Sequence, residues 1–150
     1  MIVGECSFEI KQNALNALKE YAQHDGNELC GVATGSQIGN NVLRISKISP
    51  PCIVKNGRYG CELDSVRGNE FIKQDYEVSG QTRFYIGEWH THPEQNPHPS
   101  QTDYASIIKS YASAQLSVPL LVMIIVGTEH IYFNVYDGSH FKEIEPIIVE

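Results

Sequence analysis

The chain has 150 residues, of which 41% are hydrophobic and 19% are charged, and its formal net charge is -7 at pH 7. This length supplies one hydrophobic core and excludes a second domain, so we expect residues 1–150 to form a single globular domain. The net negative charge and the lack of a Lys/Arg cluster exclude a basic surface that binds the phosphate backbone of a nucleic acid, so we expect no nucleic-acid partner.

We expect neither a membrane span nor a leader peptide. No run of eighteen apolar residues occurs, and the first residues lack a positively charged region followed by an apolar core. We therefore expect a soluble protein of the cytoplasm that does not bind membranes.

Four cysteines occur without a Cys-x-x-Cys pair, mostly in apolar or strand-like contexts. They are Cys6, Cys30, Cys52 and Cys61. This pattern predicts reduced, buried thiols rather than a structural zinc site. The alternative is a disulfide between Cys52 and Cys61 in oxidising surroundings, because these two residues bracket a flexible, glycine-containing stretch.

The N-terminal third predicts one helix followed by a hairpin. Residues 1–6 resemble a short strand, and Ser7 is placed to cap a helix. Apolar residues recur at helical spacing over residues 8–24, with charged and amide side chains off that face, which predicts an amphipathic helix. Two apolar stretches, 28–34 and 42–48, predict the two strands of a hairpin.

The middle of the chain is the part that the sequence determines least. Residues 50–68 are rich in proline, glycine and charge, so we expect a loop there, followed by a helix over about residues 64–78. Residues 83–89 are apolar and predict a central strand.

The C-terminal third predicts a helix, a buried strand and a terminal hairpin. Residues 100–114 place apolar side chains on one side of a helix. The nearly continuous apolar run at residues 118–126 is typical of a strand buried on both faces. Residues 131–136 and 141–149 flank an Asp-Gly turn and predict the hairpin. Together the elements predict an α+β fold, a curved mixed sheet flanked by helices.

Two histidines at the end of the central strand are the main functional signal. His90 and His92 are separated by one residue, so they point to the same face if the strand continues through them. Imidazole and carboxylate groups are ordinary zinc ligands, and two histidines with one carboxylate leave the fourth tetrahedral position free for water. Asp103, eleven residues after His92, supplies such a carboxylate if the loop between them folds back.

Each part of this pattern also has a simpler interpretation. Isolated His-x-His pairs are more often surface or core residues than ligands. Ser100 and Asp103 equally fit a capping box that opens a helix. The combination at this spacing is more specific than either part alone.

The combined pattern resembles the signature of the JAMM, or MPN-plus, zinc metalloproteases. The matching motif is His-x-His-Pro from His90, then Ser-x-x-Asp from Ser100, and Glu28 matches the glutamate that the family carries upstream. The resemblance covers nearly the whole chain and implies the curved α+β architecture of that family, which is similar to that of cytidine deaminases. The stretch GEWHTHPE at residues 87–94 is most similar to short bacterial members, JAB-type deconjugating peptidases of anti-phage systems with ubiquitin-like conjugation.

The resemblance implies a role for each residue of the motif. His90, His92 and Asp103 would hold one zinc ion per chain. Glu28 would act as the general base, taking a proton from the attacking water and returning it to the leaving amine. Ser100 would donate a hydrogen bond to the developing oxyanion.

Three neighbours of the motif need separate interpretation. Glu88 shares strand parity with the two histidines, so it is the alternative general base, or else a supporting or solvated side chain. His98 stands between two prolines and is expected to be exposed and not a ligand. Trp89 points opposite to the histidines and is expected in the core.

The resemblance also implies the substrate. Proteases of this kind cleave isopeptide or peptide bonds after the C-terminal tail of ubiquitin or a ubiquitin-like protein, and an extended tail can pair along an exposed strand edge. In that family the region corresponding to residues 50–68 borders the substrate cleft, so Arg58, Tyr59 and Arg67 are candidates for contact with the tail, and a solvated loop is the alternative. Two other functions stay open: a metal-dependent hydrolase of a sulfur-carrier, phage-tail or small-molecule substrate, and a non-catalytic MPN scaffold. The sequence does not indicate which modifier binds, or the oligomeric state.

Overall fold

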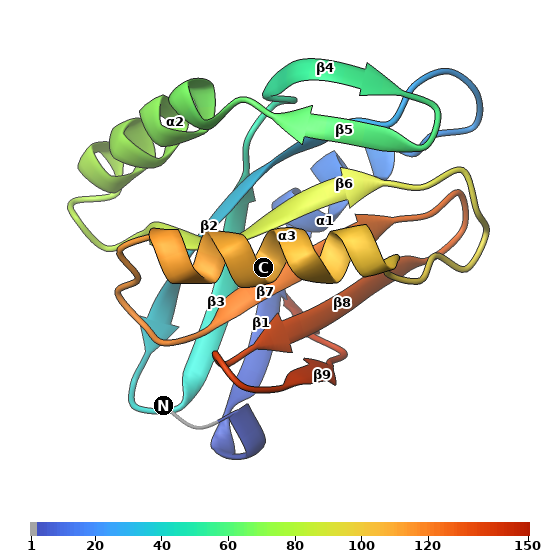
Figure 1. Ribbon diagram of the computed structural model, residues 1–150. Coiled ribbons are helices and arrows are strands. Elements are labelled where there is room, and N and C mark those ends of the chain that lie inside the picture. The colour runs from blue at the N-terminus through green and yellow to red at the C-terminus, as the bar shows by residue number, and fades with distance from the viewer. Residues whose placement is uncertain (1–2) are drawn as a thin grey trace.

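A computed structural model describes residues 3–150, which form a curled eight-stranded sheet, a two-stranded hairpin and three α-helices (Figure 1). The strand order in the large sheet is β10-β1-β3-β2-β6-β7-β8-β9, with both parallel and antiparallel neighbours. Its strands are β1 (Ser7–Lys11), β2 (Cys30–Ile38), β3 (Val42–Ile48), β6 (Phe84–Thr91), β7 (Leu121–Val126), β8 (Ile131–Tyr136), β9 (Phe141–Glu143) and β10 (Ile147–Val149). This mixed α+β sheet is the fold class that the sequence predicts.

Helices cover both faces of the sheet. Helix α1 (Gln12–Glu20) lies on one face and α3 (Gln101–Ser113) on the other, while α2 (Ser65–Val78) packs beside β2 and β6 (Figure 1). The helix predicted over residues 100–114 is therefore confirmed, and so is the helix predicted over residues 64–78. No helix within residues 3–150 is both long and apolar enough to cross a membrane.

Strand β7 divides the hydrophobic core into two parts. All six of its residues are buried. Val122 and Ile124 belong to the cluster on the α1 side, whereas Leu121 and Met123 belong to the cluster on the α3 side. Side chains of a strand alternate between the faces, so a strand that is covered on both faces must be apolar throughout. The prediction of a doubly buried strand is confirmed.

The N-terminal prediction is wrong in its boundaries. Val3–Glu5 form a 3-10 helix, and the rest of the expected opening strand, residues 1 and 2, lies outside the described residues. The sequence predicts a helix from residue 8, but Ser7–Lys11 form β1, which pairs with β3. Ile10 satisfies a helical spacing as well as the strand alternation, and the pairing with β3 decides between them.

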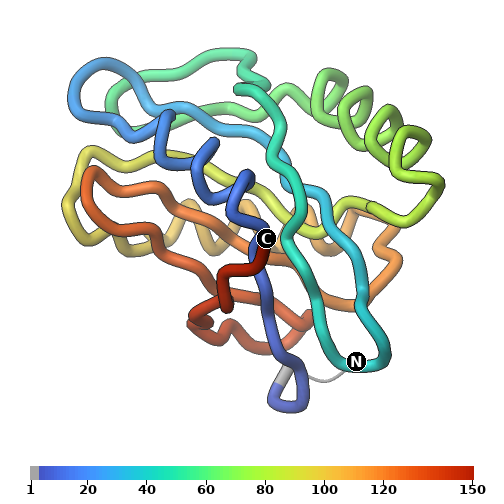
Figure 2. Tube along the Cα trace, turned by 180° about the vertical axis from the view of Figure 1, so that it is seen from behind, coloured from blue at the N-terminus to red at the C-terminus, as the bar shows by residue number. Residues whose placement is uncertain are grey.

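The predicted C-terminal hairpin is only half correct. Strands β8 and β9 form an antiparallel pair, as expected from the Asp-Gly turn. Residues 147–149 instead leave the hairpin and pair in parallel with β1, so the C-terminal end of the chain lies beside the N-terminal strand (Figure 2). Parallel pairing across the whole chain leaves no local sequence signal.

The region expected to be a loop contains a second hairpin. Strands β4 (Ile53–Gly57) and β5 (Gly60–Leu63) pair with each other and stand above β6 (Figure 1). Most of their side chains are exposed, so the hydrophobic alternation that marks a strand in a sequence is missing. Asp64 then caps α2 by accepting hydrogen bonds from the backbone of Val66 and Arg67.

Candidate functional site

Strand β6 delivers the two histidines to one face of the sheet. A β-bulge interrupts its pairing with β2 between Ala33 and Thr34. Beyond the bulge, Trp89 joins the buried core on the α1 side, and His90 and His92 are turned to the opposite side. Trp89 is 0% exposed and stacks on Tyr21 with ring centroids 5.1 Å apart, as expected for a core residue.

The start of α3 places Asp103 beside the histidines. Ser100 is the N-cap, and a complete capping box is formed. The Ser100 hydroxyl accepts a hydrogen bond from the Asp103 backbone N–H at 3.1 Å, and Asp103 Oδ2 accepts one from the Ser100 backbone N–H at 2.9 Å. The simpler interpretation of Ser100 and Asp103 as a capping box is therefore correct, and the same box fixes where the carboxylate points.

Three donor atoms form an almost regular triangle. The distances between His90 Nε2 and His92 Nε2, between His90 Nε2 and Asp103 Oδ2, and between His92 Nε2 and Asp103 Oδ2 are all 3.2 Å. A tetrahedral zinc ion with bonds of about 2.0–2.1 Å separates its ligand atoms by about 3.3 Å. The three side chains therefore fit the geometry of one zinc ion with a fourth position open.

Glu28 lies beside this triangle, two residues before the start of β2. Glu28, His90 and His92 each offer a donor atom within 4.8 Å of the others, a wider grouping than the triangle that contains Asp103. The Glu28 side chain is buried, and burial raises the pKa of its carboxyl group, an effect that the neighbouring His90 and His92 partly oppose. A carboxylate with a raised pKa next to a cation site is suited to accepting a proton.

The electrostatic environment of the triangle shifts the pKa of His92 and of Asp103. Burial acts to lower the pKa of His92, but the hydrogen bond and charge of Asp103, together with Glu28 and Glu94, outweigh it and the pKa is raised. Burial acts to raise the pKa of Asp103, but hydrogen bonds with His90 and His92 hold it far below its usual range. Asp103 is therefore a deprotonated carboxylate, the form in which a carboxyl group binds a metal.

Glu88 does not join the cluster of Glu28, His90 and His92. Its Oε2 accepts a hydrogen bond of 2.6 Å from the Tyr85 hydroxyl, and burial together with this carboxylate raises the pKa of Tyr85. Glu88 lines the same cleft as the histidines. His98 also lines the cleft and is exposed, as the sequence predicts.

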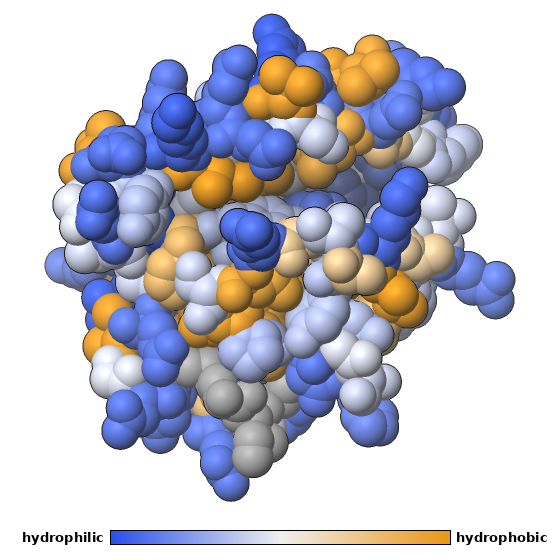
Figure 3. Space-filling view, turned by 60° about the vertical axis from the view of Figure 1, so that its left-hand side comes forward, coloured by the Kyte–Doolittle hydropathy of each residue, from blue (hydrophilic) through white to orange (hydrophobic). Residues whose placement is uncertain are grey.

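A cleft of about 1330 Å³ surrounds these groups. Its walls are the β4–β5 hairpin and α3, which lines it from the first turn to the last. Arg58 and Tyr59 at the hairpin turn line it, whereas Arg67 does not. The space-filling view shows a hollow below an upper layer on which hydrophobic residues gather in patches (Figure 3).

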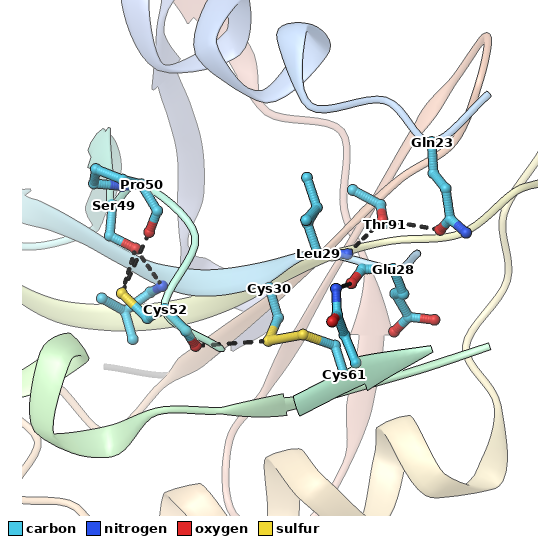
Figure 4. The surroundings of a disulfide bond; sticks show 11 residues. Gln23, Glu28, Leu29, Cys30, Ser49, Pro50, Cys52, Cys61 and Thr91 are labelled. Atoms are coloured by element: carbon cyan, nitrogen blue, oxygen red, sulfur yellow. Dashed lines mark hydrogen bonds between the residues drawn. A yellow bond between two sulfur atoms is a disulfide. The ribbon is translucent and has the colours of Figure 1, made fainter. Parts of the chain in front are cut away.

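The prediction of four reduced thiols is wrong, and so is the alternative pair. Cys30 at the start of β2 and Cys61 in β5 form a disulfide, with a Cα–Cα distance of 6.1 Å (Figure 4). Cys52 is buried and unbridged, and its thiol contacts Ser49 and the carbonyl of Pro50. The pairing follows from the docking of the hairpin on β2, which the spacing of cysteines in the sequence does not reveal.

Sequence reasoning also missed two polar residues beside the site. The side chains of Gln23 and Thr91 are 3% and 0% exposed and are hydrogen-bonded to each other at 3.0 Å. An isolated glutamine and a threonine carry no motif, so only their burial among partners identifies them.

Comparison with known proteins assigns the family. The family model described as prokaryotic homologs of the JAB domain matches residues 11–141. A Vibrio cholerae protein named CD-NTase/cGAS isopeptidase is 30% identical over 151 residues, covering 95% of this chain and 92% of that protein. A probable metalloprotease of Sinorhizobium fredii is 41% identical over 56 residues, which are 37% of this chain and 34% of that protein. The solution structure of a Desulfitobacterium hafniense protein, DSY2949, has a TM-score of 0.68 and 19% identity, covers 95% of this chain and 93% of that chain, and is similar in fold. The chain therefore belongs to the prokaryotic homologs of the JAB domain.

Proposed function

We propose that the protein is a zinc-dependent isopeptidase that removes a ubiquitin-like protein from its conjugates, or processes its precursor, in the cytoplasm of a bacterium as part of anti-phage defence. The observation that carries the proposal is the triangle of 3.2 Å between donor atoms of His90, His92 and Asp103, with the Glu28 carboxylate beside it. The isopeptidase name of relatives that match most of the chain supports the reaction, and the metalloprotease name of a shorter match supports the metal.

His90, His92 and Asp103 would hold the ion. A zinc ion held there would lower the pKa of a bound water to about 7 and would polarise a carbonyl group. Glu94 Oε1 lies 3.0 Å from Nδ1 of His92, which fixes the proton on Nδ1 and leaves Nε2 free for the metal. Asp103 contributes a negative charge, and its capping bond with Ser100 keeps the carboxylate in place.

Glu28 and Ser100 would carry the proton transfer and the oxyanion contact. The buried Glu28 carboxylate would take the proton of the attacking water and deliver it to the amine as the isopeptide bond breaks. The Ser100 hydroxyl accepts the capping bond from Asp103, and its own proton is then available for the oxygen of the scissile carbonyl. Glu88 would act in the wall of the cleft rather than as the base, because it is bound to Tyr85.

The cleft supports an extended C-terminal tail as the substrate. Strand β5 pairs with β4 in the two-stranded hairpin, and Gly60–Leu63 line the cleft. An extended tail can add to such a strand edge, where its backbone hydrogen bonds do not depend on the side chains.

A cleavage assay with metal control tests the proposal. The purified protein is mixed with fusions in which the tails of several ubiquitin-like proteins are linked to a lysine of a reporter. We expect cleavage that a chelator abolishes, that added zinc restores, and that Glu28→Gln removes. A protein that binds zinc but cleaves none of the tails would support the other hydrolase function, and a protein that binds no metal would support the scaffold.

A further inference from the structure

The segment that carries Glu28 is hydrogen-bonded to the hairpin that forms the wall of the cleft. The Glu28 backbone N–H donates to the carbonyl of Gly57 at 2.7 Å, and the Asn56 side-chain amide donates to the Glu28 carbonyl at 2.8 Å. Both polar groups of the Glu28 backbone are thus used by the end of β4. The position of the carboxylate therefore depends on where the hairpin stands.

Gln23 connects the turn of this hairpin to the loop before Glu28. Its Nε2 donates to the carbonyl of Arg58 and to the carbonyl of Gly26, each at 3.0 Å. Its Oε1 accepts a hydrogen bond of 3.0 Å from the Thr91 hydroxyl. A carbonyl group can only accept hydrogen bonds, so the amide nitrogen of Gln23 must face the two carbonyl groups and its oxygen must face Thr91. In this orientation both ends of the amide have hydrogen-bond partners.

Thr91 connects Gln23 to β6, the strand that carries His90. Its hydroxyl accepts a hydrogen bond of 3.0 Å from the backbone N–H of Leu29 and donates to Gln23 (Figure 4). Thr91 stands between His90 and His92 in the sequence, and alternation turns its side chain to the other face of the sheet. Leu29 is the residue directly after Glu28. One chain of buried and partly buried hydrogen bonds thus joins Thr91, which lies between the two histidines, to the Glu28 segment and the hairpin.

We propose that Thr91 and Gln23 are positioning residues that hold the Glu28 carboxylate at its working distance from the His90 and His92 pair. The proposal rests on the proposed function, since it states how the general base is held in position. Neither residue lines the cleft. Misplacing a reacting group by about 1 Å can cost about 100-fold in rate, so a backbone shift at Leu29 is enough to matter.

A matched set of threonine variants separates placement from stability. Thr91→Val removes the hydroxyl and keeps the shape, and Thr91→Ser keeps the hydroxyl. Thr34→Val is the control, because Thr34 is also 0% exposed and its hydroxyl donates to a buried carboxylate, Asp75, away from the site. Zinc content, kcat, KM and hydrogen exchange of the Leu29 amide are measured on each folded protein.

We expect Thr91→Val to lower kcat by about 10- to 100-fold with KM and zinc content unchanged, and to speed exchange of the Leu29 amide by at least about tenfold. Thr91→Ser should have the kcat and the Leu29 exchange rate of the wild type. Thr34→Val should lower the melting temperature without changing kcat or Leu29 exchange. Gln23→Met should act like Thr91→Val, and the double variant should be no worse than either single variant, since the two residues act as a unit.

Equal kcat and equal Leu29 exchange in Thr91→Val and the wild type would overturn the proposal. A loss of kcat in Thr91→Ser as large as that in Thr91→Val would also overturn it. If Thr91→Val does not fold, Gln23→Met decides by the same criteria. Failure of the proposed function has a different result, because the wild type itself then cleaves no conjugate, while Leu29 exchange still reports whether the hydrogen-bond chain holds the segment.

Discussion

Glu94 Oε1 lies 3.0 Å from Nδ1 of His92, on the side of the ring opposite to the atom that faces Asp103. A carboxylate in this place selects the tautomer of the ring and makes the other nitrogen a better ligand. Glu94 is itself exposed and could be replaced without disturbing the core.

We therefore predict that Glu94→Gln weakens zinc binding by about 10- to 100-fold. The measurement is competition with a chromogenic chelator at fixed pH. Glu129→Gln is the control, because Glu129 is an exposed carboxylate that contacts the neighbouring Gln95 but no histidine. Equal zinc affinities of the wild type and Glu94→Gln would show that the contact does not orient the ligand.

Ser100→Ala should affect stability and rate to different extents. Loss of the cap should lower the free energy of unfolding by about 1 kcal/mol, whereas loss of an oxyanion donor should lower kcat by about 100- to 1000-fold. Asp64→Ala, which removes the N-cap of α2, is the control for cap loss. Denaturant unfolding and steady-state kinetics give both values. A Ser100→Ala protein that loses stability like Asp64→Ala but keeps its kcat would limit Ser100 to the capping role.

Acid should weaken the contacts through which Asp75 holds α2 against the sheet. Asp75 is 2% exposed and accepts hydrogen bonds from Arg83 at 2.6 and 2.9 Å and from Thr34 at 2.6 Å. Burial acts to raise the pKa of Asp75, but the bonds from Arg83 and Thr34 outweigh it and the pKa is lowered. A lowered folded-state pKa gives stability that is complete above the pKa of the unfolded chain and disappears as the pH falls through the folded-state value.

Asp75→Asn should therefore lower the free energy of unfolding by about 3 kcal/mol at neutral pH, because Arg83 keeps a charge without its partner. The difference between Asp75→Asn and the wild type should shrink below about pH 4, where the carboxyl group of the unfolded chain is protonated. Urea unfolding of both proteins at a series of pH values measures this difference. A difference that is constant from neutral to acid pH would contradict the lowered pKa.

The disulfide should be detectable as a count of thiols. In denaturant without reductant, titration should find two reactive thiols fewer than after reduction, when all four cysteines react. The closed loop spans a sequence separation of 31 residues, so Cys61→Ser should lower the free energy of unfolding by about 3–4 kcal/mol in the chain-entropy model. Four free thiols before reduction would contradict the pairing of Cys30 with Cys61.

Local patterns predicted much of the fold and of the site. The histidine pair is set by strand alternation, and Asp103 is set by the cap at Ser100, so both follow from neighbouring residues. Strand β7 and helix α3 have continuous patterns and were predicted for the same reason. The structure brings the predicted donor atoms together, and their roles as ligands and base stay predictions.

What the sequence did not predict depends on contacts between distant parts of the chain. Residues 147–149 pair with β1 from the opposite end of the chain, and Cys61 reaches Cys30 only because the hairpin docks on β2. The exposed β4–β5 hairpin has no hydrophobic alternation to reveal it. Gln23 and Thr91 are recognisable only once their partners are in place, because hydrogen-bonding side chains are common at any position in a sequence.

The most direct test of the account is the zinc content of two variants, measured by elemental analysis of the purified proteins beside the wild type. The wild type should contain one zinc ion per chain. Asp103→Ala should lose the zinc, whereas Glu28→Gln should retain it and yet fail to cleave a ubiquitin-like fusion. Loss of zinc in Glu28→Gln together with full zinc in Asp103→Ala would make Glu28 a ligand and contradict the assignment of His90, His92 and Asp103 as the metal site.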